Sequence, residues 1–225
     1  MTRTTNARLA GVTYLLYIAL ALPSMILFDK ATRGQTIAAK LVSIAQHAVD
    51  VRVAMVLSLV TCFTALVLAV TLYAITRDVD PDLAMIALAC RVGEGIINAI
   101  FVLAALGLLW LATRAAVDAP ASAAAEALSA LILKLQGWNT LISATFFAVG
   151  STLFSYLLLR GRAIPVPLAW LGVFASLVVV VGLPLQLAGV IRGAMTSAMW
   201  LPMLAFEVPL GFWLLIKGVR TQGTQ

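Results

Sequence analysis

Long apolar runs alternate with short polar segments along the whole chain. The runs lie at about residues 9–28, 53–76, 83–113, 138–159, 164–188 and 197–216. A helix needs about 20 consecutive, mainly apolar residues to cross the hydrocarbon core of a bilayer. The pattern therefore predicts an all-α fold in which six membrane-spanning helices form a single transmembrane domain over residues 1–225.

Two polar segments between these runs show amphipathic helical spacing. In residues 36–49, apolar side chains recur at Ile37, Leu41 and Ile44, and Thr36 is placed to cap the helix. Residues 122–136 have the same kind of spacing. Short amphipathic helices often lie along a membrane interface. We expect both segments on the non-cytoplasmic side, although residues 36–49 also fit a plain connecting helix.

The turns between the runs carry recognisable start and stop signals. Asp78 or Asp80 is placed to cap a helix whose first residue is Pro81, a position that proline tolerates well. The segment 122–136 continues into the fourth run with only Gly137 between them. The sequence is therefore compatible with one long helix there, or with two helices bent near Gly137.

Composition supports a membrane protein and argues against a soluble one. The chain is 63% hydrophobic and only 11% charged, whereas soluble domains are about 25% charged. The net charge of +6 comes mainly from basic residues at the ends of the runs. There is no basic helix with interleaved aromatic residues, so nucleic acid is not an expected partner. The expected partner is the lipid bilayer.

The distribution of basic residues predicts the orientation. Arg77, Arg160 and Arg162 stand in short turns, and Arg3 and Arg8 precede the first run. Basic residues in short loops and beside the first span tend to remain on the cytoplasmic side. We therefore expect both termini in the cytoplasm.

Three charged residues interrupt the apolar runs. Arg91 and Glu94 lie in the third run, and Glu207 lies in the sixth. Each charge at membrane depth costs about 2.5–3.5 kcal/mol on insertion scales, so such residues are expected to be paired or functional. Arg91 and Glu94 are three residues apart and share a helix face. Two carboxylates then compete for one guanidinium. The carboxylate that does not pair with it is expected to be protonated or to form a hydrogen bond elsewhere.

Two interpretations of this cluster remain open. Arg91 bridges both glutamates and ties the third span to the sixth, or one glutamate is a site for a proton, an ion or a small ligand. Four other polar or aromatic residues are candidates to line the same cavity: Asn98, Trp138, Asn139 and Gln186. The tryptophan is equally typical of an anchor at the membrane interface.

The sequence predicts no metal site, no cofactor and no enzymatic activity. The single histidine, His47, lies outside the runs, and the two cysteines, Cys62 and Cys90, lie within them without a Cys-x-x-Cys motif. The known signatures of serine hydrolases, zinc proteases and phosphate loops are absent. Only a mechanism based on the carboxylates Glu94 and Glu207 would leave room for catalysis.

Three segments carry a resemblance to a known family. They are residues 8–17 (RLAGVTYLLY), 90–95 (CRVGEG) and 206–218 (FEVPLGFWLLIKG). On these, nearly the whole chain resembles the bacterial family of domains of unknown function DUF4386. The resemblance implies a six-span protein of the bacterial inner membrane, with no assigned activity, whose recurring arginine and glutamates correspond to Arg91, Glu94 and Glu207. The Pro-Leu-Gly after Glu207 departs from the more regular helix expected there.

Three functional hypotheses follow. The leading one is an integral membrane protein whose Arg/Glu cluster binds or moves a small molecule or a proton. The second is a non-catalytic sensor or accessory subunit in which the cluster is structural. The third is a membrane enzyme that acts on lipid. The sequence assigns no protein partner and no oligomeric state.

Overall fold

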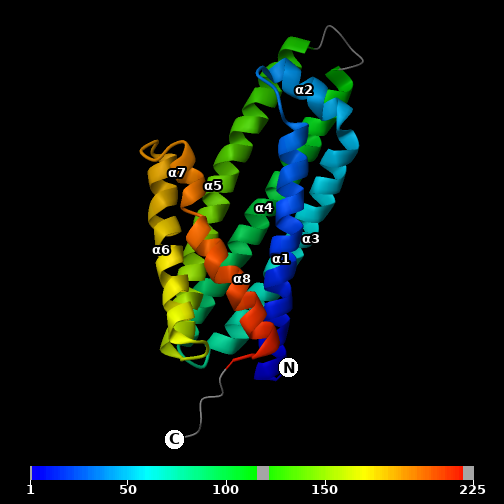
Figure 1. Cartoon of the computed structure of the whole chain (residues 1–225). Coiled ribbons are helices and arrows are strands. Elements are labelled where there is room, and N and C mark those ends of the chain that lie inside the picture. Colours follow the sequence, from blue (N-terminus) through cyan, green and yellow to red (C-terminus); the bar gives the residue numbers. More distant parts are fainter. Residues whose placement is uncertain (1, 116–121, 220–225) are drawn as a thin grey trace, which may run out of the picture. The chain divides into compact units, whose positions relative to one another are not determined.

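The computed structural model describes residues 2–115 and 122–219. These residues form eight helices and no strand (Figure 1): α1 (Arg3–Ala31), α2 (Ile37–Gln46), α3 (Ala48–Thr76), α4 (Pro81–Ala115), α5 (Ser122–Arg160), α6 (Val166–Leu187), α7 (Ala194–Ala198) and α8 (Leu201–Ile216). Within the described residues, six segments are long and apolar enough to cross a membrane, the last being α7 together with α8. The predicted all-α, six-span architecture is confirmed.

The helices α1, α3, α4 and α5 are longer than a bilayer requires. α4 has 35 residues and α5 has 39. At a rise of 1.5 Å per residue, α5 is about 58 Å long, whereas the hydrocarbon core is about 30 Å thick. α5 passes Gly137 without a break, so the segment 122–136 and the fourth span are one helix.

Local capping signals place two helix starts where the sequence predicts them. The side chain of Thr36 accepts a hydrogen bond of 3.1 Å from the backbone N–H of Ala39, at the start of α2. Oδ1 of Asp80 accepts one of 3.2 Å from the N–H of Leu83, and Pro81 is the first residue of α4. In each case a side-chain oxygen satisfies an N–H that the first turn leaves unpaired.

The chain divides into two compact units. Unit 1 comprises Met1–Tyr17, Phe63–Gly95 and Leu141–Gln225, and unit 2 comprises Ile18–Cys62 and Ile96–Thr140. α6, α7 and α8 belong wholly to unit 1, and α2 belongs wholly to unit 2. The four long helices α1, α3, α4 and α5 contribute a segment to each unit.

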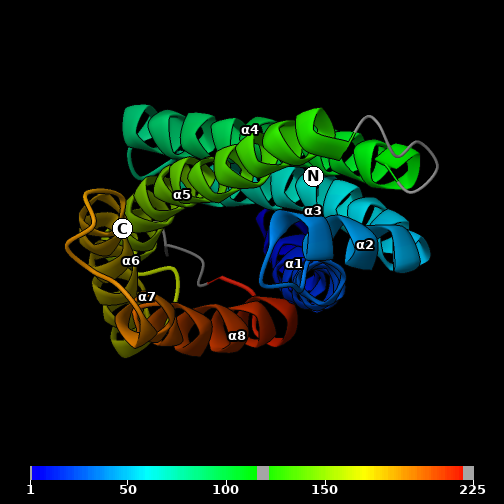
Figure 2. The same ribbon diagram turned by 90° about the horizontal axis from the view of Figure 1, so that it is seen from above.

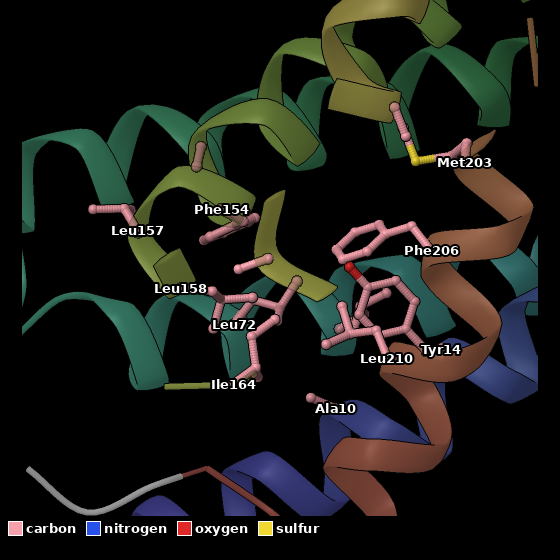
Figure 3. Close-up of a cluster of buried hydrophobic side chains, with 14 of the residues drawn as sticks. Ala10, Tyr14, Leu72, Phe154, Leu157, Leu158, Ile164, Met203, Phe206 and Leu210 are labelled. Atoms are coloured by element: carbon pink, nitrogen blue, oxygen red, sulfur yellow. The ribbon is translucent and has the colours of Figure 1, made fainter. Parts of the chain in front are cut away.

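The core of unit 1 brings α1, α5 and α8 together. Figure 3 shows Tyr14 of α1 beside Phe206 and Leu210 of α8, with Phe154 of α5 in the same cluster. α6 and α8 lie side by side in both ribbon views (Figures 1 and 2). Gly11 allows α1 to approach the backbone of α8 closely, because a Cβ there would collide with α8 at Leu215. Small residues at such crossings are typical of membrane helices.

Unit 2 has its own hydrophobic core, and both amphipathic segments contribute to it. Leu41 and Ile44 of α2 are buried with Met55 of α3 and Leu108 of α4. From α5, Ile132 packs against the same cluster. Figure 2 shows α2 beside the first turns of α3. The apolar face of α2 is therefore used for packing within unit 2, whereas Leu128, Leu131 and Leu135 of the segment 122–136 remain exposed.

The outer faces of the long helices are strongly apolar. Phe63, Leu103 and Trp170 are among many large hydrophobic side chains that remain exposed. Soluble monomers rarely expose apolar surface on this scale, and such a surface is typical of contact with lipid. Together with the six apolar helices, it defines a multi-pass membrane protein.

Candidate functional site

The centre of the site is an ion pair between two residues of α4. Nη1 of Arg91 lies 2.8 Å from Oε2 of Glu94, and each side chain is only 2% exposed. The two residues are one helical turn apart, so their side chains meet on the face that α4 turns toward the core of unit 1. The spacing seen in the sequence thus becomes a direct and fully buried contact.

Aromatic and small residues of α1 and α5 surround the guanidinium. Its Cζ lies 4.6 Å from the ring centroid of Phe147 and 5.8 Å from that of Tyr17. Gly150 provides room for the aliphatic part of Arg91, because a Cβ at this glycine would lie 3.1 Å from Cγ and Cδ. A cation over an aromatic face gains electrostatic attraction when water is excluded. The site therefore stabilises this charge through more than its carboxylate.

Glu94 joins three helices of unit 1. The hydroxyl of Tyr17, on α1, donates a hydrogen bond of 3.1 Å to Oε1 of Glu94. The hydroxyl of Ser143, on α5, donates one of 3.4 Å to the main-chain oxygen of Glu94. Both carboxylate oxygens thus have a contact, one with a phenol and one with a guanidinium.

The ion pair leaves some hydrogen-bonding capacity unused. Within the described part of the chain, Nε and Nη1 of Arg91 and Oε2 of Glu94 have no hydrogen-bond partner of good geometry. Nη1 and Oε2 are therefore close enough for electrostatic attraction, but the N–H does not point at the oxygen as it would in a hydrogen bond. A single contact of this kind lacks the parallel, bidentate arrangement that makes arginine–carboxylate pairs strong. Arg91 retains donors for a further acceptor.

The second carboxylate comes from α8. Glu207 is 7% exposed and lies close enough to Arg91, Glu94 and Tyr14 to act on them electrostatically. Among the ion pairs of the described residues, however, Arg91 pairs with Glu94 and not with Glu207. Of the two competing glutamates, Glu94 takes the guanidinium because it is on the same helix, one turn away. We call Arg91, Glu94, Glu207 and Tyr17 the charge cluster.

Helix α8 holds Glu207 without the irregularity expected after it. α8 runs continuously from Leu201 to Ile216 and contains Pro209. Phe206 and Leu210, on either side of Glu207, are buried in the core of unit 1 (Figure 3). Membrane helices tolerate an internal proline when neighbouring groups satisfy the backbone. The buried neighbours therefore fix the position of this carboxylate.

The other four candidate residues are distributed over both units. Gln186 belongs to unit 1 and is half-buried near the end of α6, whereas Asn98, Trp138 and Asn139 belong to unit 2. Trp138 is 45% exposed, and Nζ of Lys134 lies 5.6 Å from its ring centroid. A tryptophan stacked with a lysine on an exposed face fits the interface anchor that the sequence also suggested.

Sequence reasoning did not identify three residues that shape the charge cluster. Tyr17, Phe147 and Gly150 come from α1 and α5, far from Arg91 in the sequence. Tyr17 lies in a segment that carried the family resemblance, which is the only sequence signal for it. Nothing in the sequence near Phe147 or Gly150 distinguishes them from other apolar or small residues of a span.

No group of three or more histidine, cysteine, aspartate or glutamate side chains suited to a metal ion occurs among the described residues. The charge cluster itself offers one guanidinium, two carboxyl groups and a phenol. These groups can bind or exchange protons, cations or small hydrogen-bonding molecules.

The fold and the cluster define a multi-pass helical membrane protein with ionisable groups inside its core. A family model described as "Domain of unknown function (DUF4386)" matches residues 9–218, so the chain belongs to that family. The suspected relationship is thereby confirmed over nearly the whole chain. Neither the search among curated proteins nor the search among solved structures finds a match.

Proposed function

We propose that this protein binds and releases a proton at Glu207, beside the Arg91–Glu94 pair, and couples this step to binding or moving a small solute. The observation that carries the proposal is the charge balance of the cluster. Arg91 is the one buried basic residue in the described part of the chain, and Glu94 already neutralises it. An ionised Glu207 would add an unpaired charge to the interior, whereas a protonated Glu207 leaves the cluster neutral.

Because Arg91 has unused donors, loss of the proton from Glu207 would change which carboxylate pairs with Arg91. When Glu207 is protonated, Arg91 pairs with Glu94 alone, as the structure has it. When Glu207 loses its proton, its carboxylate competes with Glu94 for Arg91, whose Nε has no hydrogen-bond partner among the described residues. Because Glu207 is on α8 and Arg91 is on α4, a change of partner would shift α8 relative to α4. Two arrangements of this kind are what a transporter or a sensor needs.

We place the protein in the bacterial inner membrane with both termini in the cytoplasm. The basic residues in the turns support this orientation. It places α2 and the start of α5 on the outer side. We also maintain that the protein is not an enzyme.

A structural role for the cluster is the second candidate. The observation that favours it is the convergence of three helices at Glu94, through Tyr17 of α1 and Ser143 of α5. In that case the protein would serve as a sensor or accessory subunit, and neither glutamate would exchange a proton during its work.

Infrared difference spectroscopy on the purified protein separates the two candidates. A step in pH should produce a carbonyl stretching band from a protonated carboxylic acid. The band should disappear in Glu207→Gln and remain in Asp82→Asn, which makes the same change at an exposed carboxylate in the first turn of α4. A band that persists unchanged in Glu207→Gln would overturn the assignment of the proton to Glu207.

Flux measurements then test the coupling. In proteoliposomes with an internal pH indicator, the wild-type chain should show pH-dependent proton movement. Both Glu207→Gln and Glu94→Gln should lose it, while Asp82→Asn should retain it. If the wild-type protein and the two cluster variants behave alike, the structural role becomes the better account.

A further inference from the structure

A second set of buried polar side chains lies on α5, within unit 2. We call Ser129, Gln136 and Asn139 the polar row. Ser129 is 0% exposed and Gln136 is 5% exposed. Within the part of the chain that the structure describes, four buried atoms of the row have no hydrogen-bond partner: Oγ of Ser129, Oε1 and Nε2 of Gln136, and Nδ2 of Asn139. Native proteins rarely leave so many buried groups unpaired in one place.

The row differs from other polar side chains of unit 2. The hydroxyl of Ser24 donates a bond of 2.9 Å to the carbonyl of Ala54, and Thr113 and Thr140 each donate one of 3.0 Å to a carbonyl four residues earlier. A serine inside a helix can usually donate its hydroxyl hydrogen bond to the carbonyl four residues earlier. Ser129 does not, so its hydroxyl is available to a partner from outside the chain.

The chemistry of the row specifies a neutral partner that both donates and accepts hydrogen bonds. The amide of Gln136 offers an acceptor and two donors, the free Nδ2 of Asn139 offers donors, and the hydroxyl of Ser129 offers both. No member of the row is ionisable. Lys134, the nearest cation along α5, is exposed and lies over the ring of Trp138.

The spacing of the row favours several small partners over one large one. Ser129 and Gln136 are seven residues apart and therefore share a face of α5. Asn139 follows almost one turn later, so the row extends for about 15 Å along the helix. Ile132 and Leu133, between the polar residues, pack against the hydrophobic core of unit 2 and offer no hydrogen bonds. Water is the smallest molecule that meets these conditions.

We propose that a file of bound water molecules lies along the polar row in unit 2. Buried water typically makes about three hydrogen bonds to groups that the protein leaves unsatisfied. The four free atoms of the row supply such groups at Ser129 and then, about two and three turns further along α5, at Gln136 and Asn139. This inference does not depend on proton exchange at Glu207, because it uses residues of unit 2 alone.

Hydroxyl-radical footprinting by X-ray radiolysis provides the first test, because radicals formed from bound water oxidise the side chains beside it. The probe is Ser129→Cys, a nearly isosteric change that introduces a reactive sulfur and leaves Gln136 intact. The control is Ala112→Cys, which places the same sulfur at a buried position in the apolar core of unit 2. Both variants should elute as a single species of wild-type size.

We expect the cysteine at position 129 to oxidise several-fold faster than the cysteine at position 112. Equal, slow oxidation at the two positions would overturn the proposal, since it would mean that the row is as dry as the core. Mass spectrometry of the separate peptides distinguishes both probes from the native Cys62 and Cys90.

Thermal unfolding of Gln136→Met provides an independent test. If the row is dry, this change removes two unpaired buried atoms and should clearly raise the unfolding midpoint. If the row is hydrated, the change removes satisfied groups, and the midpoint should stay the same or fall. Leu133→Met, about one turn earlier on α5 and packed against the core of unit 2, controls for the packing of methionine. A marked rise specific to Gln136→Met would count against bound water.

Discussion

Unit 1 and unit 2 both bury polar side chains, but in different chemical states. Unit 1 buries charges, and it surrounds Arg91 and Glu94 with each other, with Tyr17 and with Phe147. Unit 2 buries neutral groups, and the side chains of Ser129 and Gln136 have no hydrogen-bond partner among the residues that the structure describes. An unpaired buried charge costs far more than an unpaired amide or hydroxyl. Charges must therefore be paired by the fold, whereas neutral groups can be satisfied by water.

The glycines of the two units also differ, in how closely other atoms surround them. In unit 1, a side chain at Gly11 would meet the backbone of α8, and one at Gly150 would meet Arg91. In unit 2, a Cβ at Gly107 or Gly137 would meet nothing within 4 Å. Unit 1 thus uses glycine to bring helices into contact, and unit 2 has helical glycines with space around them.

The largest effect should come from removing the buried cation. Arg91→Met leaves Glu94 without its counter-charge and should destabilise the protein by about 3–5 kcal/mol, the typical cost of breaking a buried pair. Denaturant unfolding in detergent micelles measures this change. The double variant Arg91→Met/Glu94→Met should recover most of the loss, because it removes both charges. If the double variant is as unstable as the single one, the pair is not the source of the effect.

The phenol that binds Glu94 should have the next largest effect. Tyr17→Phe removes only the hydroxyl that donates to Oε1 of Glu94. Hydrogen bonds to charged groups contribute about 1.5–3 kcal/mol, so a loss of that size is expected. Tyr156→Phe, at an exposed position of α5, is the matched control and should change the unfolding free energy little. Equal effects of the two variants would show that the hydrogen bond contributes nothing specific.

Crowding the contact between α1 and α8 tests the close packing of unit 1. Gly11→Ala places a methyl group against the backbone of Leu215 and Gly211. Overpacking of this kind typically costs about 1–3 kcal/mol. The loss should be seen in the same unfolding measurement. A variant as stable as the wild type would indicate that α1 and α8 are farther apart than described.

The smallest effect should have the opposite sign and belongs to unit 2. Gly137→Ala in α5 meets no neighbour and replaces the residue least suited to a helix interior other than proline. It should stabilise the protein by about 0.5–1 kcal/mol. A destabilisation would mean that Gly137 is packed as tightly as Gly11, and the contrast between the units would be lost.

Much of the fold could be predicted from local features of the sequence. The lengths of the apolar runs determine the six spans, because a bilayer requires a minimum helix length. Thr36 and Asp80 mark helix starts through contacts only three residues away. The prediction was less complete where a helix is longer than its apolar run, as in α5, because hydropathy does not show where a helix leaves the bilayer.

The charge cluster was predictable only in part. The sequence by itself brought Arg91 and Glu94 together, since a spacing of three residues on a helix is a local property. Only the tertiary structure decided that Tyr17 and Phe147 are their neighbours, that Glu207 is buried beside them without an ion pair, and that Gln136 faces the interior of unit 2. These outcomes depend on how each helix is rotated about its axis. That rotation is set by contacts between residues far apart in the chain, such as Gly11 with α8 and Gly150 with Arg91.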